Sequence, residues 1–146
     1  APEEAGVILV HDGVRPLVTP RLVRAVREAG EEGPVVPVVR IRDTVKEVDP
    51  EGRVVATLDR DRLRRVQTPQ GFPAGTLREV HRRAREEGWE STDDASLCER
   101  AGETVATVPG DPRNLKVTTP SDLARAEWLL GRGDAPTGDG SAPAAG

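Results

Sequence analysis

The sequence predicts an α/β domain with a mostly parallel sheet. Three observations favour this class. Short β-branched runs alternate with amphipathic helical segments, several helices begin with recognisable caps, and glycine or proline punctuates the boundaries between segments. The chain has 146 residues, of which 36% are hydrophobic and 32% are charged, as expected of one ordinary globular domain.

The N-terminal part is predicted to contain two strands separated by a helix. Residues 7–10 form a continuous apolar run, which is typical of a buried parallel strand. Residues 35–41 form a second, β-branched strand, in which Pro37 predicts an irregularity or an edge. Between them, a helix is expected to begin at Pro20 with Thr19 as its N-cap.

The next segment is predicted to be a projecting β-hairpin. Residues 44–48 and 54–58 are joined by a turn at 49–52, where proline and glycine provide a fixed and a permissive φ. Both arms alternate weakly and are rather polar. Because an isolated two-stranded ribbon is only marginally stable in water, the hairpin must be solvated or pack on a partner chain.

The C-terminal part is predicted to hold three helices and one strand. Apolar residues from Leu77 to Ala84 mark the first helix, and the acidic cap at 92–94 begins the second. A strand is expected at 104–108, and a capping-box-like sequence starts a last helix through Leu130.

Three regions of the chain follow from these elements. Residues 1–6 read as a leader remnant, residues 7–130 as the folded domain, and residues 131–146 as a disordered tail, because glycine, alanine, proline, serine and aspartate dominate it. The sequence contains no methionine, so we expect that the chain was processed or begins inside a domain.

Composition excludes several classes of function. A net charge of −4 argues against broad nucleic-acid binding, which usually needs a basic face. No apolar run is long enough to cross a membrane, and no segment resembles a secretory signal. The single cysteine, Cys98, rules out an internal disulfide framework and is compatible with a reducing cytoplasm.

The segment 11–16 lies at the end of the first predicted strand, where open α/β sheets bind ligands. Asp12 there could hold Mg²⁺, which prefers oxygen ligands, although a loop aspartate that caps a turn is the alternative. Arg15, Arg60 and Lys116 are candidates for phosphate contacts. Any single arginine among nineteen can also be an exposed surface residue. No phosphate-binding glycine-rich loop, Cys/His metal cluster or nucleophile–base pair is present in the sequence, which disfavours zinc and covalent chemistry.

Five segments together resemble the 2-C-methyl-D-erythritol 4-phosphate cytidylyltransferase family, in the family's order and with family-like spacing. They are VHDGVRP at 10–16, RDTVK at 42–46, DR at 59–60 followed by QTPQGF at 67–72, TDDAS at 92–96, and NLKVT at 114–118 with PSDL at 120–123. The resemblance covers about residues 7 to 130. It implies a Rossmann-like nucleotide-diphospho-sugar transferase fold and a cytoplasmic homodimer, formed through a β-arm at about residues 43–60.

The resemblance also implies a reaction. CTP and methylerythritol phosphate would give 4-diphosphocytidyl-2-C-methyl-D-erythritol and pyrophosphate, in non-mevalonate isoprenoid biosynthesis. Asp12 would help to bind Mg²⁺ and substrate, and Lys116 would lie near the reacting phosphates; these two are the implied catalytic residues. Positioning and cationic charge would supply most of the catalysis.

The implied substrate-binding residues come from two subunits. Arg15 and Thr68 would hold methylerythritol phosphate, and Thr92 would line the same site. Thr44 and Arg60, on the arm, would reach the substrate of the neighbouring subunit.

The sequence also departs from the family pattern. The family's glycine-rich loop and its cytosine-reading elements are absent, so we expect an N-terminally truncated version of the fold, with strands 7–10 and 35–41 lacking neighbours. The resemblance therefore implies the enzyme class without implying that this chain alone turns over CTP. Two alternatives stay open: a ribitol-5-phosphate cytidylyltransferase and an inactive dimerisation or interaction module.

Overall fold

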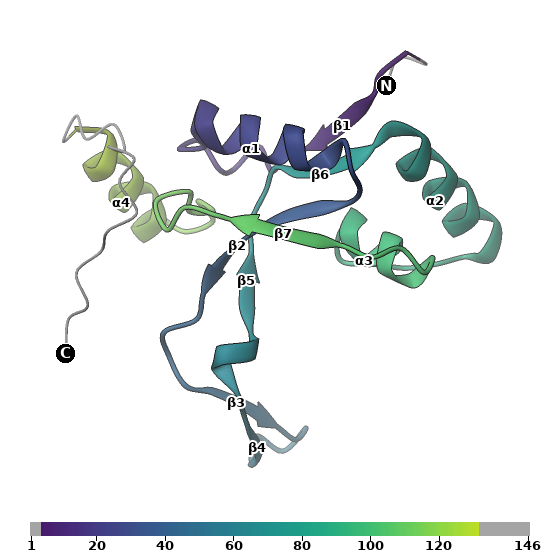
Figure 1. The fold of residues 1–146 in the computed structure, drawn as a ribbon. Coiled ribbons are helices and arrows are strands. Elements are labelled where there is room, and N and C mark those ends of the chain that lie inside the picture. Colours follow the sequence, from purple (N-terminus) through teal and green to yellow (C-terminus); the bar gives the residue numbers. More distant parts are fainter. Residues whose placement is uncertain (1–3, 132–146) are drawn as a thin grey trace.

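The computed structural model describes residues 4–131, in which a central sheet lies between two layers of helices (Figure 1). Helix α1 (Pro20–Gly30) covers one face, and α2 (Ala74–Glu87) and α3 (Asp94–Arg100) cover the other. One strand contributes to the packing on both faces of the sheet, because its successive side chains point in opposite directions. Val35 packs against α1, and Val36 packs against α2 and α3. The predicted α/β class is confirmed.

The sheet is mixed rather than mostly parallel, so that part of the fold prediction is wrong. Its order is β1 (Val7–Val10), β6 (Gln70–Pro73), β2 (Val35–Arg40) and β5 (Arg64–Val66), with β7 (Ala106–Pro109) also paired to β2. Only the β2–β7 pair is parallel, and the other three pairs are antiparallel. The reason is β6, which runs between β1 and β2 in the opposite direction.

Strand β6 also corrects the expectation that the first two predicted strands lack neighbours. It pairs with β1 along its whole length and with β2 at Val35, opposite Gly71. Gly71 is needed there, since a Cβ atom would lie 2.8 Å from the Val26 carbonyl oxygen and 2.9 Å from Val26 Cγ1. The missing side chain therefore lets α1 pack directly on β6.

The irregularity predicted at Pro37 is confirmed, but β2 is not an edge strand. Strand β7 pairs with one side of β2, while β6 and then β5 pair with the other side. Pro37 lies where the partner changes from β6 to β5, and its carbonyl accepts a hydrogen bond of 2.8 Å from the Gln67 N–H. Gln67 is thus still bonded to β2, and residues 68–69 then lead to β6.

The predicted hairpin is confirmed as a separate two-stranded sheet of β3 (Val45–Val48) and β4 (Val54–Leu58). Gly52 has φ +82° in the turn, and its N–H donates to the Asp49 carbonyl at 2.9 Å. The hairpin projects away from the three layers, below β2 and β5 in Figure 1. A short 3₁₀ turn, Arg60–Arg62, leads back to β5.

One helix cap connects α3 to the sheet. Asp93 caps α3 by accepting the Ser96 N–H at 2.8 Å, and it also accepts the Gln70 side-chain N–H at 2.9 Å, which ties α3 to β6.

The last helix, α4 (Pro120–Gly131), is confirmed and includes Gly131, which was expected in the tail. The rest of that tail and residues 1–3 of the leader lie outside the described residues. Within residues 4–131, no helix combines the length and apolar character that a membrane span requires.

Substituting Gly71 by alanine tests the close contact between α1 and β6. The new methyl group must displace Val26 backbone and side-chain atoms, so we expect Gly71→Ala to lower the free energy of unfolding by about 1–3 kcal/mol. Gly75→Ala is the matched control, because nothing lies within 4 Å of its Cβ position in α2, and it should be neutral or slightly stabilising. Urea denaturation measures both, and equal stabilities would contradict this packing.

The cap of α3 should make stability depend on pH. Burial would raise the pKa of Asp93, but the hydrogen bonds from Ser96 and Gln70 outweigh it, so the pKa lies below its ordinary value. A group with a depressed folded pKa stabilises above its unfolded pKa and loses that contribution as the pH falls through the folded pKa.

We therefore expect the free energy of unfolding of the wild-type chain to fall more steeply than that of Asp93→Asn between about pH 5 and pH 3. The difference should be on the order of 0.5 kcal/mol per pH unit, because solvent screens this half-buried group. Asp43→Asn is the control: Asp43 is exposed, so the variant should keep the wild-type slope. Parallel slopes for the wild type and Asp93→Asn would contradict the expectation.

Candidate functional site

Four of the predicted site residues meet at one edge of the sheet, where β1 ends, β6 begins and the loop after β7 returns. The Asp12 carboxylate oxygen Oδ2 lies 3.4 Å from Arg15 Nε and 3.7 Å from Lys116 Nζ. The Asp12 N–H donates to the Thr68 hydroxyl oxygen at 2.9 Å. A carboxylate, a guanidinium, an ammonium and a hydroxyl thus come together from three distant parts of the chain.

His11 holds this arrangement from the side. Its Nε2 lies 3.1 Å from the Arg15 carbonyl oxygen and its Nδ1 lies 3.0 Å from the Thr68 hydroxyl. Because a carbonyl can only accept, Nε2 carries the hydrogen in the neutral ring and Nδ1 accepts from the Thr68 hydroxyl. Both ring nitrogens are used to position neighbours, which makes His11 a structural residue of the loop.

A buried polar network supports Arg15 from below. The Asn114 carbonyl accepts an Arg15 Nη1 hydrogen at 2.7 Å, and the Asn114 amide donates to the Thr68 carbonyl at 2.9 Å. Gln67 binds both the N–H and the carbonyl of Asp111, at 3.0 and 2.7 Å. Asn114 is fully buried and Gln67 nearly so. The guanidinium of Arg15 is thereby fixed from two sides, by Asn114 and Asp12.

Neither Gln67 nor Asn114 was singled out from the sequence, although both lie in the segments that carry the family resemblance. Gly110 packs closely against Gln67: a Cβ atom at this position would lie 2.5 Å from Gln67 Oε1. Among the described residues, Asn114 Oδ1 is the buried side-chain oxygen that lacks a hydrogen-bond partner. It lies in the wall of a cleft.

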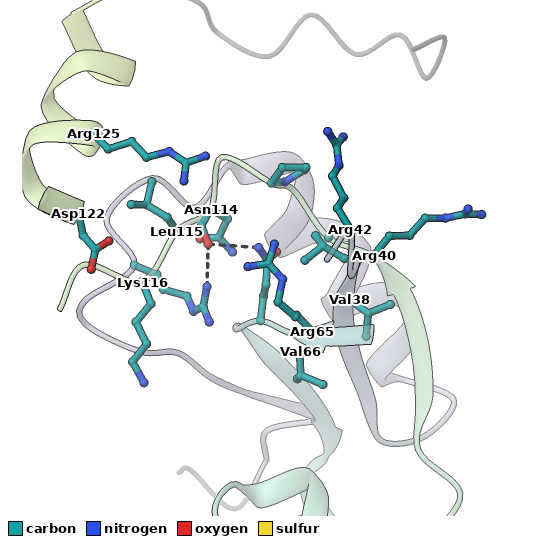
Figure 2. A pocket seen from close by; sticks show the side chains of 15 residues that line it. Val38, Arg40, Arg42, Arg65, Val66, Asn114, Leu115, Lys116, Asp122 and Arg125 are labelled. Atoms are coloured by element: carbon teal, nitrogen blue, oxygen red, sulfur yellow. Dashed lines mark hydrogen bonds between the residues drawn. The ribbon is translucent and has the colours of Figure 1, made fainter. Parts of the chain in front are cut away.

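This cleft has a volume of about 740 Å³ and is strongly basic (Figure 2). Its lining includes one acidic residue, Asp122, and six basic residues. These basic residues are Arg15, Arg40, Arg42, Arg65, Lys116 and Arg125. Four of them were not predicted as site residues, because nothing in the sequence separates them from the other exposed arginines.

The remaining predicted residues do not join this cluster within the described chain. Thr44 and Arg60 lie at the base of the hairpin, where both are exposed, and the Arg60 guanidinium donates to the Arg42 carbonyl. Thr92 is also exposed and lines a separate hollow beside Trp89 and Asp93.

A divalent cation would find one carboxylate ligand here. No group of three or more histidine, cysteine, aspartate or glutamate side chains that could hold a metal occurs among residues 4–131. Both cations contact Asp12 Oδ2, and no described residue is bonded to Oδ1. Mg²⁺ is commonly bound by one or two carboxylates together with substrate phosphates, and Asp12 fits that mode.

The comparisons with known proteins identify the family of the chain. Residues 1–132 match the family model described as IspD: 2-C-methyl-D-erythritol 4-phosphate cytidylyltransferase. The chain is 52% identical over 129 residues to the 2-C-methyl-D-erythritol 4-phosphate cytidylyltransferase of Saccharopolyspora erythraea, covering 87% of this chain and 56% of that protein. It is 49% identical over 138 residues to the bifunctional enzyme IspD/IspF of Rhodopseudomonas palustris strain HaA2, covering 92% of this chain and 34% of that protein.

Solved structures give the same result. The 2-C-methyl-D-erythritol 4-phosphate cytidylyltransferase of Thermus thermophilus superposes with a TM-score of 0.78 at 42% identity, covering 86% of this chain and 62% of that one. The 4-diphosphocytidyl-2C-methyl-D-erythritol synthase of Anaerococcus prevotii has a TM-score of 0.82 at 30% identity, covering 90% of this chain and 62% of that one. The chain thus spans between a third and two thirds of the length of these relatives, and it belongs to the 2-C-methyl-D-erythritol 4-phosphate cytidylyltransferase family.

Proposed function

We propose that this chain provides the polyol-phosphate site of a cytidylyltransferase that converts 2-C-methyl-D-erythritol 4-phosphate and CTP to 4-diphosphocytidyl-2-C-methyl-D-erythritol and pyrophosphate. Family membership supports the reaction. The observation that carries the proposal is the meeting of Asp12, Arg15, Thr68 and Lys116 at one edge of the sheet.

The chemistry of these side chains suits phosphoryl transfer. A phosphate oxygen of methylerythritol phosphate would attack the α-phosphorus of CTP, forming a new P–O bond while the bond to pyrophosphate breaks. No general base is needed, because a phosphate monoester is already largely ionised near pH 7. Arg15 and Lys116 would neutralise the two approaching anions, and the fixed guanidinium of Arg15 would orient the substrate phosphate.

Asp12 would hold Mg²⁺ through its carboxylate, and the ion, when bound, would supply further neutralisation of phosphate charge. Thr68 would contribute a hydroxyl at the same point, next to the Asp12 backbone. Thr92 is proposed to contact the polyol part of the substrate.

The hairpin is proposed to form a homodimer and to place Thr44 and Arg60 in the partner's site. Its strands expose apolar side chains, with Val48, Val54 and Val55 being 56%, 60% and 57% exposed. Such an exposed ribbon gains stability by packing on a second copy.

A cytoplasmic location belongs to the same proposal. CTP is an intracellular nucleotide, and Cys98 is a buried free thiol whose pKa is raised to about 11, chiefly by burial. Cell fractionation of the native host tests this location, and recovery of the protein with secreted material would contradict it.

Substitution of Arg15 tests the substrate site. We expect Arg15→Gln to weaken the binding of methylerythritol phosphate to this chain about tenfold or more, because a charge-assisted bidentate contact is lost. Isothermal titration calorimetry measures the dissociation constant, and Arg21→Gln, on exposed α1 surface, is the matched control. Equal affinities of the two variants would contradict the site. Tighter binding of ribitol 5-phosphate than of methylerythritol phosphate would reassign the substrate.

Substitution in the hairpin tests the dimer. We expect the wild-type chain to sediment as a dimer, and Val55→Asp to shift it to a monomer, because a carboxylate would be buried in an apolar interface. Leu123→Asp, at a 52% exposed apolar position outside the hairpin, should remain dimeric. A monomeric wild-type chain, or dissociation by both substitutions, would contradict an interface made by the hairpin.

A further inference from the structure

The basic cleft carries more positive charge than the proposed substrate site uses. Arg15 and Lys116 both contact Asp12, and in the proposed function they would bind one phosphate group. The other basic residues of the lining, Arg40, Arg42, Arg65 and Arg125, come from β2, β5 and α4 and the segment after β2. They are separate from the Asp12 cluster.

The acidic residue of the cleft does not neutralise this charge. The Asp122 carboxylate accepts the Thr118 N–H at 3.1 Å and the Thr119 N–H at 3.0 Å, where it caps the start of α4. These bonds, led by the one from the Thr118 backbone, hold the pKa of Asp122 below its ordinary value. Asp122 is thus ionised and already bonded to its own helix.

The four additional arginines have no acceptor within the described chain. No hydrogen bond or ion pair from the guanidinium groups of Arg40, Arg42, Arg65 or Arg125 occurs among residues 4–131, whereas Arg15, Arg53 and Arg82 each contact a carboxylate. An unpaired exposed arginine is unremarkable by itself. Four around one concave surface produce a local positive potential that favours an anion.

Two of these arginines face the inner wall of the cleft. In Figure 2, Arg125 reaches from α4 toward the loop that carries Asn114 and Leu115, and Arg65 approaches the same loop from β5. Arg40 and Arg42 extend away from that loop. Arg65 and Arg125 line the same cleft as Arg15 and Lys116.

We infer that Arg65 and Arg125 form a second anion subsite, so that the cleft binds a diphosphate group rather than a single phosphate. The planar guanidinium fork matches phosphate oxygens, and two arginines complement a group that carries about two negative charges. The volume of about 740 Å³ lies within the range of small-molecule sites and exceeds what one phosphate fills. This inference rests on the proposed phosphate site at Arg15 and Lys116, but it does not require that the chain catalyses the transfer reaction.

Calorimetry with inorganic phosphate and inorganic pyrophosphate at fixed ionic strength tests the subsite. We expect the full chain to bind pyrophosphate about tenfold or more tightly than phosphate. Arg65→Gln and Arg125→Gln should each remove about fivefold to tenfold of the pyrophosphate affinity and leave phosphate affinity nearly unchanged. Both positions are exposed, so the variants should keep the wild-type melting temperature.

Arg21→Gln and Arg85→Gln are matched controls, since they remove the same charge from exposed surfaces of α1 and α2. Equal affinity of the wild-type chain for phosphate and pyrophosphate would overturn the subsite. An equal loss of pyrophosphate affinity in the controls would also overturn it, because net charge alone would then explain binding.

A second titration identifies the source of the diphosphate. Cytidine diphosphate that binds with the same dependence on Arg65 and Arg125 indicates a diphosphate ester, whereas binding of free pyrophosphate alone indicates the inorganic ion. Either result retains the subsite. Methylerythritol phosphate binding should be unaffected by both substitutions, so failure of the proposed substrate site and failure of this subsite give different patterns.

Discussion

The structure depends on the insertion of β6 between β1 and β2. Four residues of this strand pair with β1 on one side and reach β2 on the other. Gly71 lets α1 pack on the strand, Phe72 is fully buried against α2 and α3, and Gln70 bonds to the start of α3. Both helical layers are therefore positioned by one short strand, and a change in its register would move each of them.

The candidate site follows from the same strand, at the point where it begins. Residues 67–69 connect β5 to β6 beside Pro37, and the side-chain polar groups of Gln67 and Thr68 bond to residues outside the sheet ladder. The Thr68 hydroxyl bonds to Asp12 and His11, and the Gln67 side-chain amide bonds to Asp111. Because such groups are buried or half-buried, each requires a partner, and the resulting network fixes the loops that carry Asp12 and Lys116. The irregularity of the sheet thus organises the cluster.

Local features of the fold could be predicted from the sequence, and the central arrangement could not. The cap at Thr19 and the hairpin turn at Gly52 depend on residues within a few positions, so the pattern contains the information. Strand β6 is four residues long, contains glycine and proline, and shows no alternation, so nothing local marks it as a strand. Its antiparallel direction is set by packing against β1 and β2, and this explains why a mostly parallel sheet was the wrong expectation.

The site residues differ in the same way. Asp12, Arg15, Thr68 and Lys116 were identified through family-like segments, whereas Arg65 and Arg125 look like any other arginine until the fold brings them to one cleft.

The cleft is basic although the chain has a net charge of −4, because carboxylates form their bonds elsewhere in the fold. Asp93 and Asp122 cap helices, and Asp49 accepts N–H groups in the hairpin turn. On α2, Glu79 and Glu86 both pair with Arg82. Acidic groups bonded to neighbours in sequence cannot reach across to β2 and β5, so the arginines there stay uncompensated although the whole molecule is acidic. Local capping therefore separates the charges, and an anionic ligand would meet a positive cleft because Coulomb interactions in salt fall off within about 8–10 Å.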